Sequence, residues 1–312
     1  MLKNLLTLGL ALIWDRALGE PPSVIHPVVW IGKATELSTT GYPTGDNDRD
    51  FERGAMAGMA IPLAAALAGW SAMRVFKSFG WVAEVLGGAF LLKTTFAIRS
   101  MEQEAANVDH ALGADDIESA RSAVSRIVSR DVSELDASGI ASTTISSVAE
   151  NVSDSVVAPL LYYSVFGVPG ALAFRAINTM DAMIGYHGKY EYLGRVPARL
   201  DDVAGFAPAR VAGTAVIASA AIQQGFNVAG AADTMLTEHG RTESPNGGWS
   251  IGAMAGAMDV EIEKVGHYRL GPPDRKAGQR DIRRSVKLFN GAALIAGGLA
   301  AAVIVTRAAR RM

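Results

Sequence analysis

Two acidic residues and an amide stand at the start of one of the most apolar segments of the chain. In SSVAENVSDSVVAPLLYY, residues 146–163, Glu150, Asn151 and Asp154 precede a run without charge. Glu150 and Asp154 are four residues apart, so on a helix their carboxylates would share one face, about one turn from each other. Because like charges at that distance repel, the pair indicates a metal ion, an arginine partner or a solvated surface.

A second polar group follows the same apolar run. In RAINTMDAMIGYHGKYEYLGRVPARLDD, residues 175–202, a cation, an amide and a carboxylate recur at helical spacing as Arg175, Asn178 and Asp181. The other charged candidates, in a predicted turn and at the end of the segment, are Lys189, Asp201 and Asp202. A solvated, salt-bridged surface would explain such a pattern, but ionisable groups that continue a membrane segment are costly and tend to be functional.

Three further motifs place polar residues next to turns. Charges surround a double proline in residues 15–32, DRALGEPPSVIHPVVWIG. A short charged corner, SRD, stands at 129–131. Residues 244–258, SPNGGWSIGAMAGAM, open with a turn whose backbone donors can hold an anion. Taken singly, each also fits a helix cap, a turn or a surface. Their candidate residues are Asp15, Glu20, His26, Arg130, Ser244 and Asn246.

Several kinds of site are excluded. The chain has no cysteine, which rules out disulfides, zinc-thiolate sites and thiol nucleophiles. Its five histidines show no metal-ligand spacing, and it contains no P-loop motif. With Lys+Arg 29 against Asp+Glu 31, no basic field suggests nucleic acid as a partner.

The composition indicates a membrane protein, because 49% of the residues are hydrophobic and only 19% are charged. A bilayer core of about 30 Å needs roughly 20 apolar residues of helix. Residues 54–73 and 288–306 carry no charge, and 211–232 is uncharged but contains Gln223, Gln224 and Asn227. The other candidate spans are 1–14, 79–98 and 155–174. The span 79–98 contains Glu84 and Lys93, and it is predicted to form a hairpin with 54–73.

The span 155–174 is predicted to be broken. It contains Pro159, Gly167, Pro169 and Gly170, and irregular backbone at membrane depth is tolerated only where protein or a water-filled cavity covers it. The sequence therefore predicts an all-α, polytopic integral membrane helical bundle. It would have about four to five spans, one of them broken or re-entrant, in a single catalytic domain, residues 1–312, whose polar helical loops carry the site.

Positive charge gives an orientation. Six basic residues lie within 275–287, before the last span, whereas Arg307, Arg310 and Arg311 follow it. The larger count predicts that 275–287 faces the cytoplasm and that the C-terminal end faces outside.

Together the motifs resemble those of the adenosylcobinamide-phosphate synthase family, the CobD/CbiB proteins of cobalamin biosynthesis. Six motifs occur in the family's order over nearly the whole chain. They are DRALGEPP with His26-Pro27, SRD, SVAENVSDSVVAPLLYY, GVPGALAFRAINTMDAMIGY, RLDDV with PAR at 208–210, and SPNGGWSIGAMAGAM. Two positions depart from the pattern: Ser146 replaces a common glutamate, and Ser155 replaces a glycine.

The resemblance implies a multi-pass enzyme of the cell membrane whose active site faces the cytoplasm. It would join a corrinoid substrate, adenosylcobyric acid, to (R)-1-aminopropan-2-ol O-phosphate or a close analogue through an amide bond, with ATP as co-substrate and Mg²⁺. Its partners would be these small molecules and the lipid bilayer, with a homo-oligomer or a complex with other cobalamin-assembly enzymes as further possibilities.

This chemistry suggests roles for the candidate residues. Carboxylate oxygens suit Mg²⁺, so Glu150, Asp154 and Asp181 are candidates for metal ligands, with one of them as a catalytic base. Phosphate groups would be held by cations, and the amides would orient carboxylates or substrate amides. The candidates for substrate and phosphate binding are Arg130, Arg175, Lys189, Asn151, Asn178, Asp15, Glu20, His26, Asp201, Asp202, Ser244 and Asn246.

Two other classes of protein stay open. A transporter would also keep ionisable groups near broken helices, although its charges should lie mid-span and its halves should repeat. A non-catalytic membrane subunit of a corrinoid biosynthetic complex would explain the loss of the glutamate at Ser146. The retained polar residues, Glu150 and Asp154 among them, oppose that reading.

Overall fold

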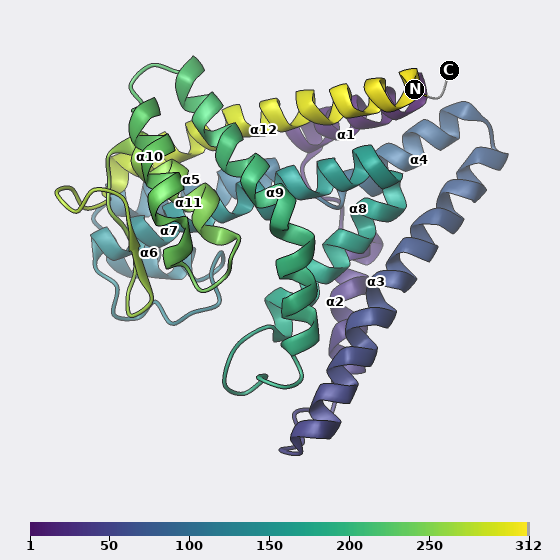
Figure 1. The fold of residues 1–312 in the computed structure, drawn as a ribbon, viewed down its shortest axis with the longest axis horizontal. Coiled ribbons are helices and arrows are strands. Elements are labelled where there is room, and N and C mark those ends of the chain that lie inside the picture. The colour runs from purple at the N-terminus through teal and green to yellow at the C-terminus, as the bar shows by residue number, and fades with distance from the viewer. Residues whose placement is uncertain (311–312) are drawn as a thin grey trace. The chain divides into compact units, whose positions relative to one another are not determined.

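The computed structural model describes residues 1–310 and is almost entirely helical (Figure 1). Arg311 lies outside the described residues. The all-α prediction is confirmed, with one small addition, an antiparallel hairpin of strands β1 (Ile262–Lys264) and β2 (Tyr268–Leu270). The α-helices are α1 (Leu2–Leu18), α2 (Pro27–Ser38), α3 (Asn47–Ser78), α4 (Trp81–Lys93), α5 (Ile98–Gly113), α6 (Ile117–Val124), α7 (Ala137–Val152), α8 (Ala158–Ile184), α9 (Arg195–Ile222), α10 (Val228–Glu238), α11 (Gly247–Met258) and α12 (Gln279–Ala309).

Within residues 1–310, five helical segments are long and apolar enough to cross a membrane, and they make the chain a polytopic membrane protein. The segments include three of the predicted spans, 54–73, 155–174 and 288–306, and overlap two more, 79–98 and 211–232. They run Asn47–Ser78, Trp81–Gly113, Ala137–Ile184, Arg195–Ile222 and Gln279–Ala309. The predicted first span, 1–14, lies in α1, which has 17 residues and is not one of the five.

The described chain divides into two compact units. Unit 1 comprises Met1–Ala97, Ala158–Gly205 and the chain from Gly297, and unit 2 comprises Ile98–Val157 and Phe206–Ala296. Helices α9 and α12 contribute residues to both units. Each unit is described separately below, and the single catalytic domain stays a prediction.

In unit 1, the long helix α3 packs along α8, while α4 lies beside α1 (Figure 1). Small residues allow the backbones to approach closely. A Cβ on Gly54 would collide with the carbonyl oxygen of Leu193, and a Cβ on Gly58 would stand 3.3 Å from Pro197. The predicted hairpin is present, because α3 ends at Ser78 and α4 begins at Trp81, with Gly80 in the turn at φ 101°.

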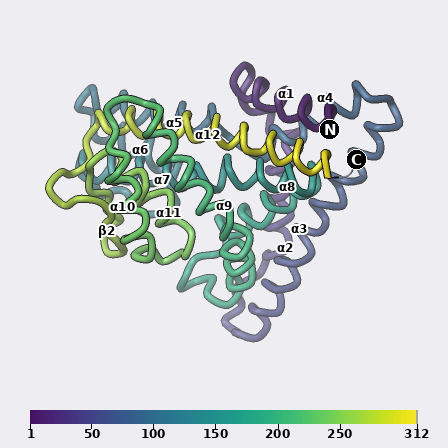
Figure 2. The backbone as a smooth tube through the Cα atoms, turned by 45° about the horizontal axis from the view of Figure 1, so that its top comes forward, coloured from purple at the N-terminus to yellow at the C-terminus, as the bar shows by residue number. Residues whose placement is uncertain are grey.

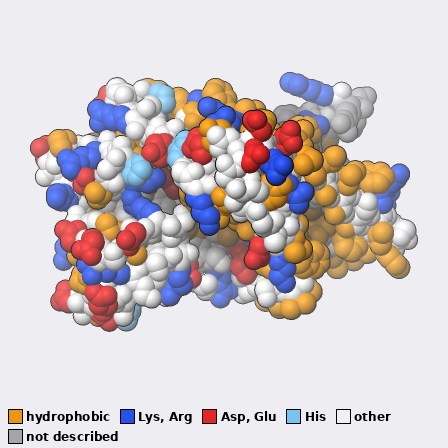
Figure 3. Space-filling model, turned by 90° about the horizontal axis from the view of Figure 1, so that it is seen from below, with side chains coloured by type: hydrophobic (Ala, Val, Ile, Leu, Met, Phe, Trp, Pro, Cys, Tyr) orange, Lys and Arg blue, Asp and Glu red, His pale blue; other side chains and the backbone are white. Residues whose placement is uncertain are grey.

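The outer face of this hairpin is apolar. Figure 3 shows hydrophobic side chains gathered over it with few charges between them. The large exposed hydrophobic side chains of α3 are Phe51, Met56, Met59, Leu63, Leu67, Trp70 and Val75. An exposed apolar surface of this extent indicates contact with lipid.

The predicted break in 155–174 is confirmed at one position. A π turn, Ser153–Val157, separates α7 from α8, and Gly167 interrupts α8 with φ 71° and ψ −165°. The break requires Gly167 because an L-residue rarely adopts that backbone conformation. Pro159 and Gly170, by contrast, lie inside helical turns.

The bounds predicted for 211–232 are wrong. Helix α9 begins at Arg195 and ends at Ile222. Gln223 lies beyond its end, where its side-chain amide donates to Ser219 Oγ and to the carbonyl oxygen of Lys287. Asn227 caps the next helix by accepting from the Gly230 amide at 2.8 Å. The uncharged run therefore contains the end of one helix and the start of the next, and Asn227 caps that start.

In unit 2, helices α10 and α11 form the closest helix pair (Figure 2). A Cβ on Gly256 would collide with the backbone of Gly230, so this approach depends on glycine. Helix α11 follows directly after the predicted Pro/Gly turn at residues 244–246, and ten of its twelve residues are buried. The turn and the small-residue helix are thus confirmed.

Candidate functional site

The two carboxylates of SVAENVSD lie on either side of a change in helix geometry in unit 2. Glu150 is in the last turn of α7, and Asp154 is in the π turn that follows. Glu150 is exposed, Asp154 is half-buried, and the Asp154 charge acts on the Glu150 carboxylate. The structure therefore keeps the two like charges close, and π turns of this kind are frequent at functional sites.

Two cations act on Glu150. They are Arg130, which the sequence predicted, and Lys264 of β1, which it did not. Arg130 Nη2 donates to Thr143 Oγ1 of α7 at 2.7 Å, which fixes the guanidinium beside the helix that carries Glu150. No sequence signal linked Lys264 to this group, because the contact depends on how the hairpin packs against α7.

Arg130 also lines a polar cavity of about 280 Å³ within unit 2. A second cation, Lys276, lies in its wall with the carboxylates Glu134, Glu261 and Glu263. Glu263 is already paired, since its Oε1 lies 2.7 Å from Arg269 Nη2. The cavity thus presents both signs of charge to a small molecule.

The Asn151 amide is engaged within its own segment. Its Nδ2 donates to the Ser147 carbonyl oxygen at 2.8 Å, and its Oδ1 accepts from Ser155 Oγ at 2.6 Å. Ser155 is one of the two departures from the family pattern, and its hydroxyl supplies a bond that glycine lacks. A substrate role for Asn151 stays a proposal.

Ser146, the other departure, lies one turn before Glu150 and is buried. Its Oγ is 2.8 Å from the hydroxyl of Tyr268 in β2. Burial, followed by the Glu150 charge, raises the pKa of Tyr268, so its phenol stays protonated. Ser146 therefore joins α7 to the hairpin by a neutral hydrogen bond.

We expect Ser146→Ala and Tyr268→Phe each to lower the free energy of unfolding by about 1 kcal/mol, because each removes one partner of a buried hydrogen bond. The double variant should lose less than the sum of the two. Unfolding in mixed detergent micelles measures the three values. Strict additivity would show that the two hydroxyls do not interact.

In unit 1, Arg175 and Asn178 contact each other on α8, as their spacing predicted. Arg175 Nη1 donates to Asn178 Oδ1 at 3.0 Å, and Asn178 Nδ2 donates to Asp201 Oδ1 of α9 at 3.4 Å. This chain of side chains joins the two helices and fixes the guanidinium. Asp181 is half-buried, and its carboxylate folds against Gly185, where a Cβ would collide with Oδ1.

Lys189 and Asp202 lie at the margins of this group. Lys189 is exposed in the predicted turn, with its Nζ 5.1 Å from the ring centre of Tyr190. Asp202 is 3.9 Å from Arg199 Nη1.

Asp15, Glu20 and His26 form a third group, together with Lys93. Lys93 is fully buried, and its Nζ lies 3.1 Å from Asp15 Oδ1, 2.8 Å from Glu20 Oε1 and 3.2 Å from the Phe96 carbonyl oxygen. The ammonium donates hydrogen bonds to the Glu20 carboxylate and to the Phe96 carbonyl oxygen, and it forms an ion pair with Asp15. The sequence identified Lys93 only as a costly charge in a membrane span.

His26 completes the group. Its Nδ1 accepts from the Val28 amide at the start of α2, so its Nε2 is the atom that donates to Glu20 Oε2 at 3.0 Å. Partial burial alone would raise the pKa of Glu20, but the hydrogen bonds from His26 and Lys93 outweigh it and hold that pKa below its usual value.

The turn with Ser244 and Asn246 lies beside an aromatic stack in unit 2. Arg210 is held between Phe206 and Trp249, 3.4 and 4.5 Å from their ring centres, and its Nη1 lies 3.5 Å from Asn246 Oδ1. Ser244 Oγ accepts from the Asn246 amide at 3.2 Å. Arg210 ends the PAR motif, and its charge was the signal that could have identified it.

The donor set limits which metal could bind. Among residues 1–310, no group of three or more His, Asp and Glu side chains is assembled for a metal ion. Mg²⁺ usually takes one or two protein carboxylates and fills its other positions with water and substrate phosphates. The Glu150–Asp154 pair fits that smaller requirement.

These features define a polytopic helical membrane protein with charged side chains grouped on its apolar helices. Residues 8–289 match the CobD/Cbib protein family, and the chain belongs to that family. It is 36% identical over 297 residues to the cobalamin biosynthesis protein CobD of Dehalococcoides mccartyi, covering 93% of this chain and 94% of that protein.

Two archaeal relatives, each named probable cobalamin biosynthesis protein CobD, are similar. The protein of Pyrococcus abyssi is 39% identical over 286 residues, with 91% of each chain covered. That of Methanocaldococcus jannaschii is 36% identical over 290 residues, with 92% of each chain covered. No solved structure matches the chain.

Proposed function

We propose that this protein is an adenosylcobinamide-phosphate synthase. It would join adenosylcobyric acid to (R)-1-aminopropan-2-ol O-phosphate, or to a close analogue, by an amide bond at the expense of ATP. The observation that carries the proposal is the Glu150–Asp154 pair at the π turn, with Arg130 and Lys264 acting on the same carboxylate.

Amide formation from a carboxylate requires an activated acyl group. A carboxylate oxygen of the corrinoid attacks the γ-phosphorus of ATP, and ADP leaves. The neutral amine nitrogen then attacks the acyl carbon, and inorganic phosphate leaves with one oxygen of the former carboxylate. Each step gathers negative charge on phosphate oxygens, so the protein must supply cations and a proton acceptor.

The residues of unit 2 suit the charge requirement. Glu150 and Asp154 would hold Mg²⁺, which when bound neutralises phosphate charge. Arg130 and Lys264 act on Glu150 and add positive charge at the same place. With one of these two carboxylates on the ion, the other would accept the proton of the substrate ammonium. Asp181 of unit 1 stays a separate proposed catalytic residue, because it is half-buried and ionisable.

The cavity of about 280 Å³ next to Arg130 suits the smaller substrate. An aminoalkyl phosphate carries an anionic phosphate and a cationic amine, and the cavity offers Arg130 and Lys276 for the first and Glu134 and Glu261 for the second. The corrin ring is too large for this cavity and would bind to an open surface.

The same function implies a setting. We propose that the protein resides in the cell membrane with its active site toward the cytoplasm, where ATP and the corrinoid are dissolved. Association with itself or with other cobalamin-assembly enzymes would allow the corrinoid product to pass onward.

Arg175→Lys is expected to raise the KM for one phosphate-bearing substrate about tenfold, because lysine keeps the charge but loses the planar fork. Arg175→Ala should be much worse. Steady-state kinetics with ATP and the amine phosphate varied in turn measure both. The matched control is Arg199→Lys, an exposed arginine of the same unit. A fall in thermal stability with every KM unchanged would make Arg175 a structural residue.

The proposed reaction can be tested with purified protein in detergent. Adenosylcobyric acid, the amine phosphate, ATP and Mg²⁺ are combined, and the amide-linked corrinoid is measured by mass spectrometry. We expect product only when ATP is present. Corrinoid binding without product would favour a non-catalytic subunit, and corrinoid flux into vesicles without product would favour a transporter.

A further inference from the structure

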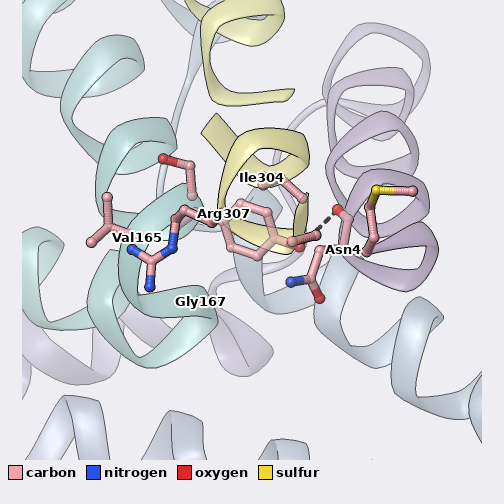
Figure 4. A pocket seen from close by; sticks show the side chains of 9 residues that line it. Asn4, Val165, Gly167, Ile304 and Arg307 are labelled. Carbon is pink, nitrogen blue, oxygen red and sulfur yellow. Dashed lines mark hydrogen bonds between the residues drawn. The ribbon is translucent and has the colours of Figure 1, made fainter. Parts of the chain in front are cut away.

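A cavity of about 440 Å³ lies within unit 1, away from every candidate residue discussed above. Figure 4 shows it between α8 and the ends of α1 and α12. Its wall includes Asn4, Val165, Gly167, Ile304 and Arg307. The proposed ligase chemistry uses none of these residues.

Arg307 is the charged group in this wall. It lies in the last turn of α12, a helix apolar enough to span a membrane, and is half-buried. In Figure 4 its side chain extends toward the stretch of α8 that carries Val165 and Gly167. Within residues 1–310 it makes no ion pair. A half-buried guanidinium is costly without an anion, so the position calls for a negatively charged ligand.

A neutral donor faces the same cavity. The backbone oxygen of Asn4 accepts from the Tyr163 hydroxyl at 2.9 Å, which ties α1 to α8 (Figure 4). The Asn4 side-chain amide makes no hydrogen bond with any other described residue. The wall thus offers a guanidinium and an amide donor, both of which are groups that bind phosphate oxygens.

The rest of the surroundings is apolar. Val165 and Ile304 line the cavity, and Phe166 and Val305, the next residues on the two helices, are exposed. A free phosphate or a soluble phosphate ester gains nothing from such a surface, whereas the glycerol and acyl chains of a lipid do.

We propose that this cavity binds the phosphate of an anionic phospholipid, with Arg307 on the phosphate and the acyl chains along the exposed apolar residues beside it. The bound lipid would hold α1, α8 and α12 together at the membrane surface. The site is independent of the ligase proposal, because it neither uses its residues nor requires its reaction.

The test uses delipidated protein in detergent, titrated separately with phosphatidylglycerol, phosphatidylcholine and glycerol 1-phosphate. Native mass spectrometry counts bound lipid, and thermal unfolding measures stabilisation. We expect phosphatidylglycerol to bind and to raise Tm more than phosphatidylcholine. Arg307→Gln should weaken its binding about tenfold or more, as expected for the loss of a charge-assisted hydrogen bond.

Arg310→Gln is the matched control, because Arg310 lies one turn further on but is exposed and outside the cavity. It should retain wild-type lipid binding, and Asn4→Ala should show an intermediate loss. Equal retention by the Arg307 and Arg310 variants would overturn the site. Equal stabilisation by glycerol 1-phosphate would identify a soluble phosphate ester as the ligand and overturn the assignment to lipid.

Discussion

Glu150→Gln and Asp154→Asn are each expected to lower turnover by about 10²- to 10⁴-fold, the range typical of a group that takes part in the chemistry. Both replacements keep the shape of the side chain and remove its charge. Because the pair combines two like charges at one turn, removing one of them should not destabilise the fold. Thermal unfolding of the variants should therefore match that of the wild type.

Magnesium separates the possible roles. If a carboxylate holds the ion, raising Mg²⁺ should restore part of the lost activity, because a weakened site can still fill by mass action. A catalytic base would show no such recovery. Asp233→Asn is the matched control, since Asp233 is exposed on α10 of the same unit. Near-normal activity of both variants at low Mg²⁺ would move the site elsewhere.

Lys93→Met is expected to lower the free energy of unfolding by about 3–5 kcal/mol. Lys93 is fully buried with Asp15, and methionine would fill its volume while leaving the Asp15 carboxylate buried without its cation. The double variant Asp15→Asn with Lys93→Met should recover part of the loss, because the unpaired charge is then gone. Lys77→Met, at an exposed position of α3, is the control. A Lys93→Met protein as stable as this control would contradict the paired arrangement.

Glu20, which belongs to the same group as Lys93 and Asp15, makes the free energy of unfolding depend on pH. Because the pKa of Glu20 is lower in the folded protein than in the unfolded chain, its contribution to stability is present above the unfolded pKa. That contribution is lost as pH falls through the lowered folded value. Unfolding measured from neutral to acidic pH should show this loss in the wild type and a smaller one in Glu20→Gln. A stability of Glu20→Gln that falls with pH as steeply as that of the wild type would contradict this role of Glu20.

Much of the fold follows from the distribution of charge and of Gly and Pro along the sequence. The uncharged runs at 54–73 and 288–306 lie inside membrane-length helices, and Gly167 breaks α8 as expected. The error at 211–232 arose because hydropathy does not register a helix end. There Gln223 lies just past the end of one helix and donates to Ser219, and Asn227 caps the start of the next helix.

The candidate site was predictable only where its contacts are local. Arg175 and Asn178 are three residues apart on one helix, so spacing sufficed. Lys93, by contrast, reaches Glu20 from 73 positions away in the sequence, and Asp15 lies further away still. Pairings of this kind depend on helix packing, which no single-sequence pattern encodes.

The hairpin illustrates the same limit. Tyr268 and Lys264 reach the Ser146–Glu150 face of α7 from two three-residue strands. Strands that short carry too little periodicity to be recognised against a helical background. The sequence alone therefore does not reveal that Tyr268 and Lys264 lie beside Ser146 and Glu150.

If this chain forms an amide by activating a carboxylate with ATP, one oxygen atom of that carboxylate must pass to phosphate. Adenosylcobyric acid is labelled with ¹⁸O in its reacting carboxylate and incubated with the purified protein, ATP, Mg²⁺ and the amine phosphate. We expect one labelled oxygen in inorganic phosphate and the other in the amide carbonyl of the product. Amide product formed with no label in phosphate, or formed equally well without ATP, would contradict this mechanism.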